Sequence, residues 1–232
     1  MQIYGRGSLI RLILTTSIIQ VNGKEAAGKK ISILDVSDEP SIFSLMLAER
    51  FPQNMVTCAI SQEMPKVSLP SNVSTFKFDK FTDIENAGKF DVIILKELTK
   101  ESPELIGLLS QLKKLLANSE GKIILMARPK SPPLPLPEPC LQLWPKIALT
   151  REEILAACSK AKIFCTTYSA SIPIKVERFD WESILFSGCF PVVKISPKCT
   201  AKEITEFCKE QSAMISFEEK ISLYLLQLTE TT

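Results

Sequence analysis

The side chains that this chain can use for chemistry do not include histidine. Its 232 residues contain none. A Ser-His-Asp triad, a Cys-His dyad, a histidine-ligated zinc ion and a histidine general base are therefore excluded. Any catalysis would have to use carboxylates, Lys, Tyr, Cys or a cofactor.

In the absence of histidine, cysteine is the reactive residue type to consider next, with seven copies. The chain contains Cys58, Cys140, Cys158, Cys165, Cys189, Cys199 and Cys208. Their number is odd, no two are spaced as Cys-x-x-Cys, and no histidine is present to activate a thiolate. We therefore expect reduced thiols packed as small hydrophobic side chains in the cytoplasm, a reducing compartment, and no metal site.

Charge and glycine content argue against several classes of ligand. The chain has 28 Lys and Arg against 26 Asp and Glu, so its net charge of +2 gives no strong signal for nucleic acid. The apolar stretch at 8–23 is short and contains Arg11, so we expect an amphipathic helix there and no membrane span. Only eight glycines are present, and neither GxGxxG nor GxxxxGK[ST] occurs, which disfavours a nucleotide or dinucleotide binder.

The elements that must position any site alternate between strand and helix patterns. Strands are predicted at 31–36, 54–60, 73–78, 89–95, 122–127, 163–168 and 221–228. Helices are predicted at 8–23, 41–51, 103–117, 151–160 and near 200–210. Such alternation requires right-handed crossovers and a parallel sheet covered on both faces. A last strand that follows an insertion predicts an antiparallel hairpin at the sheet edge.

The predicted fold class is therefore α/β, a doubly wound and mostly parallel seven-stranded sheet with an antiparallel C-terminal hairpin. We expect a single domain over 1–232. Its parts are an N-terminal helix at 1–27, a βα core at 28–128, a proline-rich loop at 129–145, and a C-terminal part at 146–232 with an insertion at 173–215.

The proline-rich segment at 129–145 holds seven of the fifteen prolines. We predict an extended, stiff segment that is neither a helix nor a central strand. It is interpreted either as a crossover loop constrained by its prolines or as a ligand for domains with aromatic grooves. Trp144 within it is a candidate for an exposed anchor at an interface.

A second group of aromatic side chains lies in the insertion. Phe179, Trp181, Phe186 and Phe190 could line a groove for a substrate or a partner at the carboxyl edge of the sheet. The spacing of 179, 186 and 190 also suits the buried face of a helix. Both interpretations are open from the sequence.

The order of elements resembles the class I S-adenosylmethionine-dependent methyltransferases. The residues Lys-Ile-Ser-Ile-Leu-Asp-Val at 30–36 resemble the first strand of the family and its acidic end. Phe-Asp-Val-Ile-Ile at 90–94 resembles the fourth strand, and 112–125 resembles the leucine-rich helix and the fifth strand. The resemblance covers roughly 28–168 and 221–228, and it implies a Rossmann-like methyltransferase fold.

The resemblance also implies where a cofactor would bind and where this chain departs from the family. The implied S-adenosylmethionine contacts are Asp35, Ser37, Ser61, Glu63 and Asp79. Ser37 and Glu39 stand where the family has the two glycines of its cofactor turn, so the permissive backbone is lost. The acid for the ribose is displaced to Glu63, whereas Asp79 matches the acid that faces adenine.

Two functions follow from this mixture. The first is a methyltransferase-like domain that has lost cofactor chemistry and acts through protein contacts, as a partner subunit or in a multienzyme assembly; no cofactor and no catalytic residue are then expected. The alternative is an active methyltransferase with a divergent cofactor loop, in which Lys96 and Glu97 would lie at the rim near the substrate. Methyl transfer is mostly positioning, so the missing histidines do not forbid it.

Overall fold

The structure is a computed structural model of the whole chain. It describes residues 30–36, 42–60, 69–78, 81–96, 98–100, 104–187 and 190–228, and every structural statement below concerns these residues. The helix predicted at 8–23 lies outside them.

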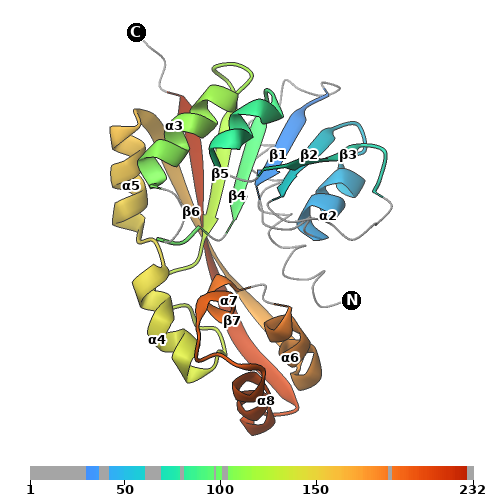
Figure 1. The fold of residues 1–232 in the computed structure, drawn as a ribbon, viewed down its shortest axis with the longest axis vertical. Helices are drawn as coiled ribbons and strands as arrows, with labels where there is room; N and C mark the ends of the chain where they lie inside the picture. The colour runs from blue at the N-terminus through green and yellow to red at the C-terminus, as the bar shows by residue number, and fades with distance from the viewer. Residues whose placement is uncertain are drawn as a thin grey trace.

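Seven strands form one sheet in the order β3-β2-β1-β4-β5-β7-β6. The parallel strands are β1 (Ser32–Val36), β2 (Met55–Ile60), β3 (Val73–Lys77), β4 (Val92–Lys96) and β5 (Lys122–Ala127). β7 pairs antiparallel with both β5 and β6 (Figure 1). The predicted fold class is therefore confirmed.

Helices cover the two faces of this sheet. One face packs against the 3-10 helix η1 (Phe81–Ala87), α3 (Leu105–Leu115) and α5 (Arg151–Lys160), and the other packs against α2 (Ile42–Arg50). A capping box begins α5: Glu153 N donates to Thr150 Oγ1 at 3.1 Å, and Thr150 N donates to Glu153 Oε2 at 2.7 Å. α3 and α5 follow their predicted positions because their apolar residues recur at helical spacing.

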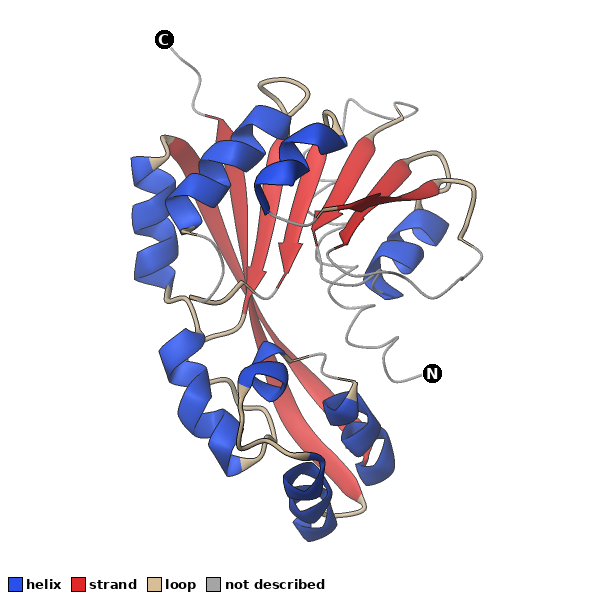
Figure 2. Ribbon diagram, viewed as in Figure 1, coloured by secondary structure: helices blue, strands red, loops and turns tan. Residues whose placement is uncertain are grey.

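The C-terminal hairpin is much longer than predicted. β6 (Ile163–Glu177) and β7 (Met214–Leu228) each have 15 residues and pair without interruption. The prediction of an insertion at 173–215 is therefore wrong at both ends, because 173–177 and 214–215 continue the two strands. The hairpin runs past the sheet and carries a second set of helices at its far end (Figures 1 and 2).

The prediction that 129–145 is a loop is also wrong in its second half. α4 (Glu138–Ile147) occupies that half and contains both Pro139 and Pro145. Pro139 lies in the first turn, where its missing N–H has no intrahelical acceptor to lose. Pro145 does interrupt the helical hydrogen bonds, and the burial of Trp144 and Ile147 on either side of it offsets that loss.

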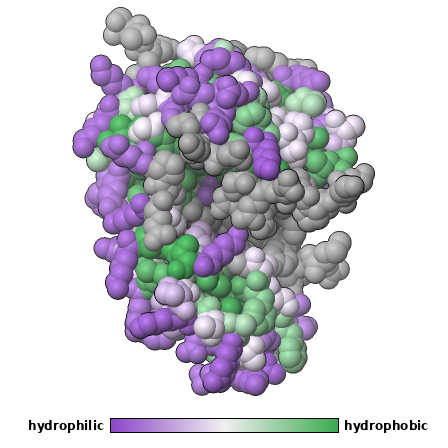
Figure 3. All heavy atoms as spheres, viewed as in Figure 1, coloured by the Kyte–Doolittle hydropathy of each residue, from purple (hydrophilic) through white to green (hydrophobic). Residues whose placement is uncertain are grey.

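α4 belongs to a second hydrophobic core, which we call the hairpin lobe (129–148 and 174–217). The lobe also contains α6 (Arg178–Phe186), α7 (Pro191–Ile195) and α8 (Ala201–Glu210). Its buried residues include Leu136, Trp144, Trp181, Phe190 and Ile204. In the space-filling view, hydrophobic residues of this lobe show at the surface between hydrophilic ones (Figure 3). The seven-stranded sheet is thus joined to a separate packed lobe by its longest strands.

Candidate functional site

The candidate site lies at the carboxyl ends of β1 and β4, which are neighbours in the sheet. Asp35, the second-last residue of β1, is opposite Ile94 of β4. Because side chains alternate along a strand, Lys96 extends from the same face as Ile94 and Asp35. α2 covers this face, so both ionisable side chains lie beneath a helix.

Lys96 forms an ion pair with Asp35 inside the protein. Its Nζ lies 2.9 Å from Asp35 Oδ2, with the Lys96 side chain 8% exposed and the Asp35 side chain fully buried. Ser44 of α2 donates its hydroxyl to the same Oδ2. The carboxylate therefore has a positive charge and a hydroxyl donor next to it, which is the arrangement that a buried charge needs.

The sequence-based placement of Lys96 at the rim of a substrate site is wrong. Its side chain points inward and bonds Asp35, 61 residues away in the chain. A lysine at the end of an otherwise apolar strand is normally solvated, because its long stem reaches the surface. A buried acid on the adjacent strand keeps it inside instead, and no local pattern in the sequence links the two.

Cys58 completes this cluster from β2, opposite Asp35. Burial raises the pKa of the Cys58 thiol, a hydrogen bond with Ser44 lowers it, and the charge of Asp35 raises it further. The net shift is upward, so the thiol stays protonated at neutral pH. Cys58 is a packing residue, as predicted for most of the cysteines.

The other four implied cofactor contacts fall in parts of the chain that the structure does not describe. Ser37, Ser61, Glu63 and Asp79 lie outside the described residues, as do Glu39 and Glu97. Their grouping around a cofactor stays a prediction. Of the implied contacts, Asp35 lies within the described residues, and its carboxylate is bound by Lys96 and Ser44.

A second ionic contact lies where the sheet meets the hairpin lobe. Arg128, directly after β5, donates from Nε to Glu219 Oε1 of β7 at 3.2 Å and from Nη2 to the same oxygen, and both side chains are buried. The Arg128 guanidinium also lies 5.0 Å from the centre of the Phe190 ring. The sequence analysis did not single out Arg128 or Glu219, which are 91 residues apart.

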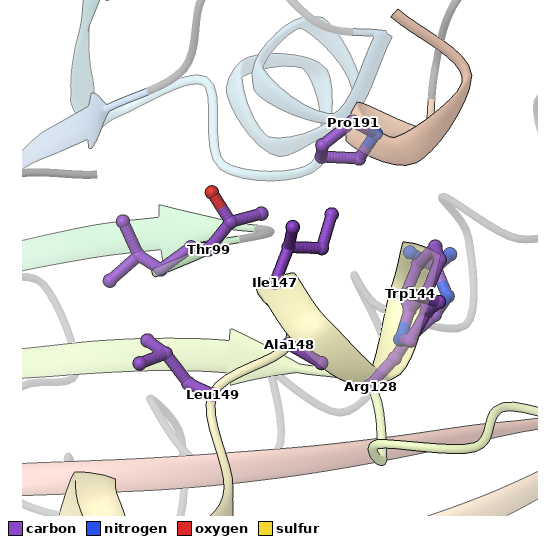
Figure 4. Close-up of a pocket in the computed structure, with 8 residues that line it drawn as sticks. Thr99, Arg128, Trp144, Ile147, Ala148, Leu149 and Pro191 are labelled. Atoms are coloured by element: carbon purple, nitrogen blue, oxygen red, sulfur yellow. The ribbon is translucent and has the colours of Figure 1, made fainter. Parts of the chain in front are cut away.

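Arg128 lines a small recess between the two cores (Figure 4). Around it lie Thr99, which follows β4 in the chain, Ile147 of α4 and Pro191 of α7 (Figure 4). Its volume of about 20 Å³ suffices for a water molecule and for nothing as large as a nucleoside.

The aromatic residues do not behave as the sequence suggested. Trp144 is not an exposed anchor: it is 5% exposed, and its Nε1 donates to the carbonyl of Pro129 at 3.2 Å. Trp181 is buried and donates to the carbonyl of Pro135 at 2.8 Å. The Trp181 bond ties the proline segment to α6, and the Trp144 bond joins two ends of the segment itself, so the segment is a packed part of the hairpin lobe.

The helix-face interpretation of 179, 186 and 190 is wrong, because Phe190 is buried but lies outside α6, as the N-cap of α7. Phe190 packs against both Trp144 and Trp181, at ring-centre distances of 6.5 and 5.6 Å. Phe179 and Phe186 are exposed on α6. Aromatic type and spacing alone could not distinguish them, because the buried face of α6 is set by its contacts with the hairpin and α8.

The described part of the chain offers neither a metal site nor a membrane-spanning helix. No group of three His, Cys, Asp or Glu residues there could hold a metal ion. Among the same residues, no helix is long and apolar enough to cross a membrane.

Comparison with known proteins finds likeness in structure only. No protein-family model matches the chain, and no curated protein matches it. A protein assigned as a sarcosine dimethylglycine methyltransferase from Galdieria sulphuraria superposes with a TM-score of 0.55 at 11% identity, over 95% of this chain and 86% of that one. Coclaurine N-methyltransferase bound to N-methylheliamine and SAH gives 0.53 at 13% identity, over 91% and 71%. A precorrin-6y C5,15-methyltransferase from Geobacter metallireducens gives 0.50 at 8% identity, over 91% and 87%. The chain therefore has the class I methyltransferase fold, and identities this low show the fold alone.

Proposed function

We propose that this chain is a methyltransferase-like domain that has lost cofactor chemistry and works through contact with other proteins, as a partner subunit or within a multienzyme assembly. The observation that carries the proposal is the buried ion pair of Lys96 with Asp35. Asp35 stands where the resemblance puts the acid that begins the cofactor turn, and its charge is neutralised from within.

An internal partner changes what this end of the sheet can bind. S-adenosylmethionine carries a sulfonium and an ammonium, and a free carboxylate would attract both. In the ion pair, the ammonium of Lys96 lies 2.9 Å from Asp35 Oδ2, so the pair as a whole is neutral. Releasing Asp35 for a ligand would break a buried ion pair, which is strongly unfavourable.

The sequence around the cofactor turn supports the same conclusion. Ser37 and Glu39 replace the glycines through which the family brings its backbone close to the cofactor. Glu39 would also place a second negative charge near the carboxylate of the cofactor, which is repulsive. The residues of this chain therefore do not fit S-adenosylmethionine.

Cofactor binding is the direct test. S-adenosylmethionine and S-adenosylhomocysteine are titrated into the chain by calorimetry, with an active class I methyltransferase as the positive control. A ligand at 100 times its dissociation constant stabilises a protein by about 2.7 kcal/mol, which corresponds to a rise in Tm of about 5–11 °C for a chain of this length. We expect no heat of binding and no change in Tm at millimolar ligand. Micromolar binding would refute the proposal in favour of an active enzyme.

A variant separates the turn from the ion pair. Ser37→Gly/Glu39→Gly restores both glycines and leaves Lys96 bound to Asp35. We expect this variant to remain unable to bind either ligand, because the acid is still neutralised. Binding by the variant would show that the turn alone had prevented it, and that the ion pair has no part in the loss.

A further inference from the structure

The two edges of the sheet differ in how they are protected against pairing with another strand. An edge strand exposes unpaired N–H and C=O groups, and proteins usually block it by short length, charges, proline or a bulge. β3 at one edge has five residues and ends on the charged Lys77. β6 at the other edge has 15 residues and pairs with β7 without a bulge.

The first ten residues of β6 have none of these protections. From Ile163 to Ile172 the sequence contains no charged residue and no proline. Phe164 is 57% exposed and Tyr168 is 44% exposed. They lie four residues apart on a strand, so both extend from one face, with Thr166 between them. This is the aromatic and β-branched composition that favours strand pairing.

We propose that β6 pairs antiparallel with β6 of a second copy of this chain, about a two-fold axis at Thr166. The inference deepens the protein-contact part of the proposed function and rests on that part. In this register, Phe164 of each copy lies directly opposite Tyr168 of the other, because Phe164 is two residues before the axis and Tyr168 is two residues after it. Two aromatic cross-strand pairs form on one face, and the two sheets become one.

The residues of the strand favour a second copy over a different partner. At the two-fold axis Thr166 meets Thr166 of the other copy, so a charge at that position would face a like charge. In this register the two β6 strands overlap from Ile163 to Ser169, because residue 163 pairs with residue 169, and that overlap contains no charged residue. A second copy brings its own Phe164 and Tyr168, so each of these exposed aromatic side chains meets an aromatic side chain across the axis.

The test is the oligomeric state of the full chain by analytical ultracentrifugation over a wide range of concentration. We expect a dimer for the native chain. Thr166→Lys places two ammonium groups side by side at the axis and should raise the dimer dissociation constant by about a hundredfold or more. Thr75→Lys is the matched control: it makes the same substitution at an exposed position of β3 and should leave the dimer intact.

Charge rescue tests the position of the axis. An equal mixture of Thr166→Lys and Thr166→Glu chains should form a heterodimer as readily as the native chain dimerises, because opposite charges then meet at the axis. A native chain that is monomeric throughout, a dimer that survives Thr166→Lys, or a mixture that fails to associate would each overturn the inference.

These results can be separated from those of the cofactor test. A dimer that binds S-adenosylmethionine would refute the loss of cofactor chemistry and leave the β6 interface standing. A monomer that binds no cofactor would overturn the interface and leave that loss standing.

Discussion

Removing the lysine of the buried ion pair tests the reasoning about the site most directly. Lys96→Met keeps an unbranched side chain of similar length and removes the positive charge that lies 2.9 Å from Oδ2 of the fully buried Asp35. Breaking a buried ion pair from one side costs about 3–5 kcal/mol. In a chain of this length each kcal/mol lowers Tm by about 2–4 °C, so we expect a fall of about 6–20 °C. Urea unfolding followed by circular dichroism measures the free energy.

The matched variant removes the charge that Lys96→Met leaves behind. Asp35→Asn/Lys96→Met keeps the shape of both side chains and buries no uncompensated charge, so it should be more stable than Lys96→Met alone. A loss below about 1 kcal/mol in the single variant would refute the buried pair, because exposed pairs contribute that little. A double variant no more stable than the single one would show that the two residues do not interact.

Three further predictions concern other parts of the fold. Thr150→Ala removes the N-cap of α5 and should lower the free energy of unfolding by about 1 kcal/mol. Hydrogen bonding from Cys158 lowers the pKa of the half-buried Cys165, so peptide mapping should find Cys165 alkylated first among the described cysteines. Its rate should exceed theirs most at a pH below the ordinary thiol pKa, and Cys158→Ala should slow the alkylation of Cys165. Trp181→Phe leaves a buried carbonyl without its donor and should cost about 1–3 kcal/mol in unfolding free energy, whereas Phe179→Leu on the exposed face of the same helix should change it by less than about 0.5 kcal/mol.

Local sequence determined most of the elements of the sheet lobe. The strand predicted at 122–127 is β5 to the residue, and the helix predicted at 151–160 is α5 with its capping box. Such elements depend on side-chain periodicity and on contacts within a few residues, and the sequence displays both. The order of strands and helices then restricted the topology to a doubly wound sheet with a terminal hairpin.

Tertiary contacts decided where local signals conflicted with packing. The prolines of α4 argue against a helix, and the helix forms because Trp144 and Ile147 are buried in the hairpin lobe. β6 continues to Glu177 because β7 pairs with it over its whole length. Neither partner lies nearby in the sequence, so neither result could be predicted from it.

The candidate site divides in the same way. The sequence by itself determined that no histidine chemistry is possible, that the cofactor turn lacks its glycines, and that an acid lies one residue before the end of β1. The tertiary structure alone decided that this acid is bound to Lys96, 61 residues away, and that Arg128 is bound to Glu219, 91 residues away. The physical reason is that burial makes an unpaired charge so unfavourable that its partner must come from whichever strand the fold places beside it.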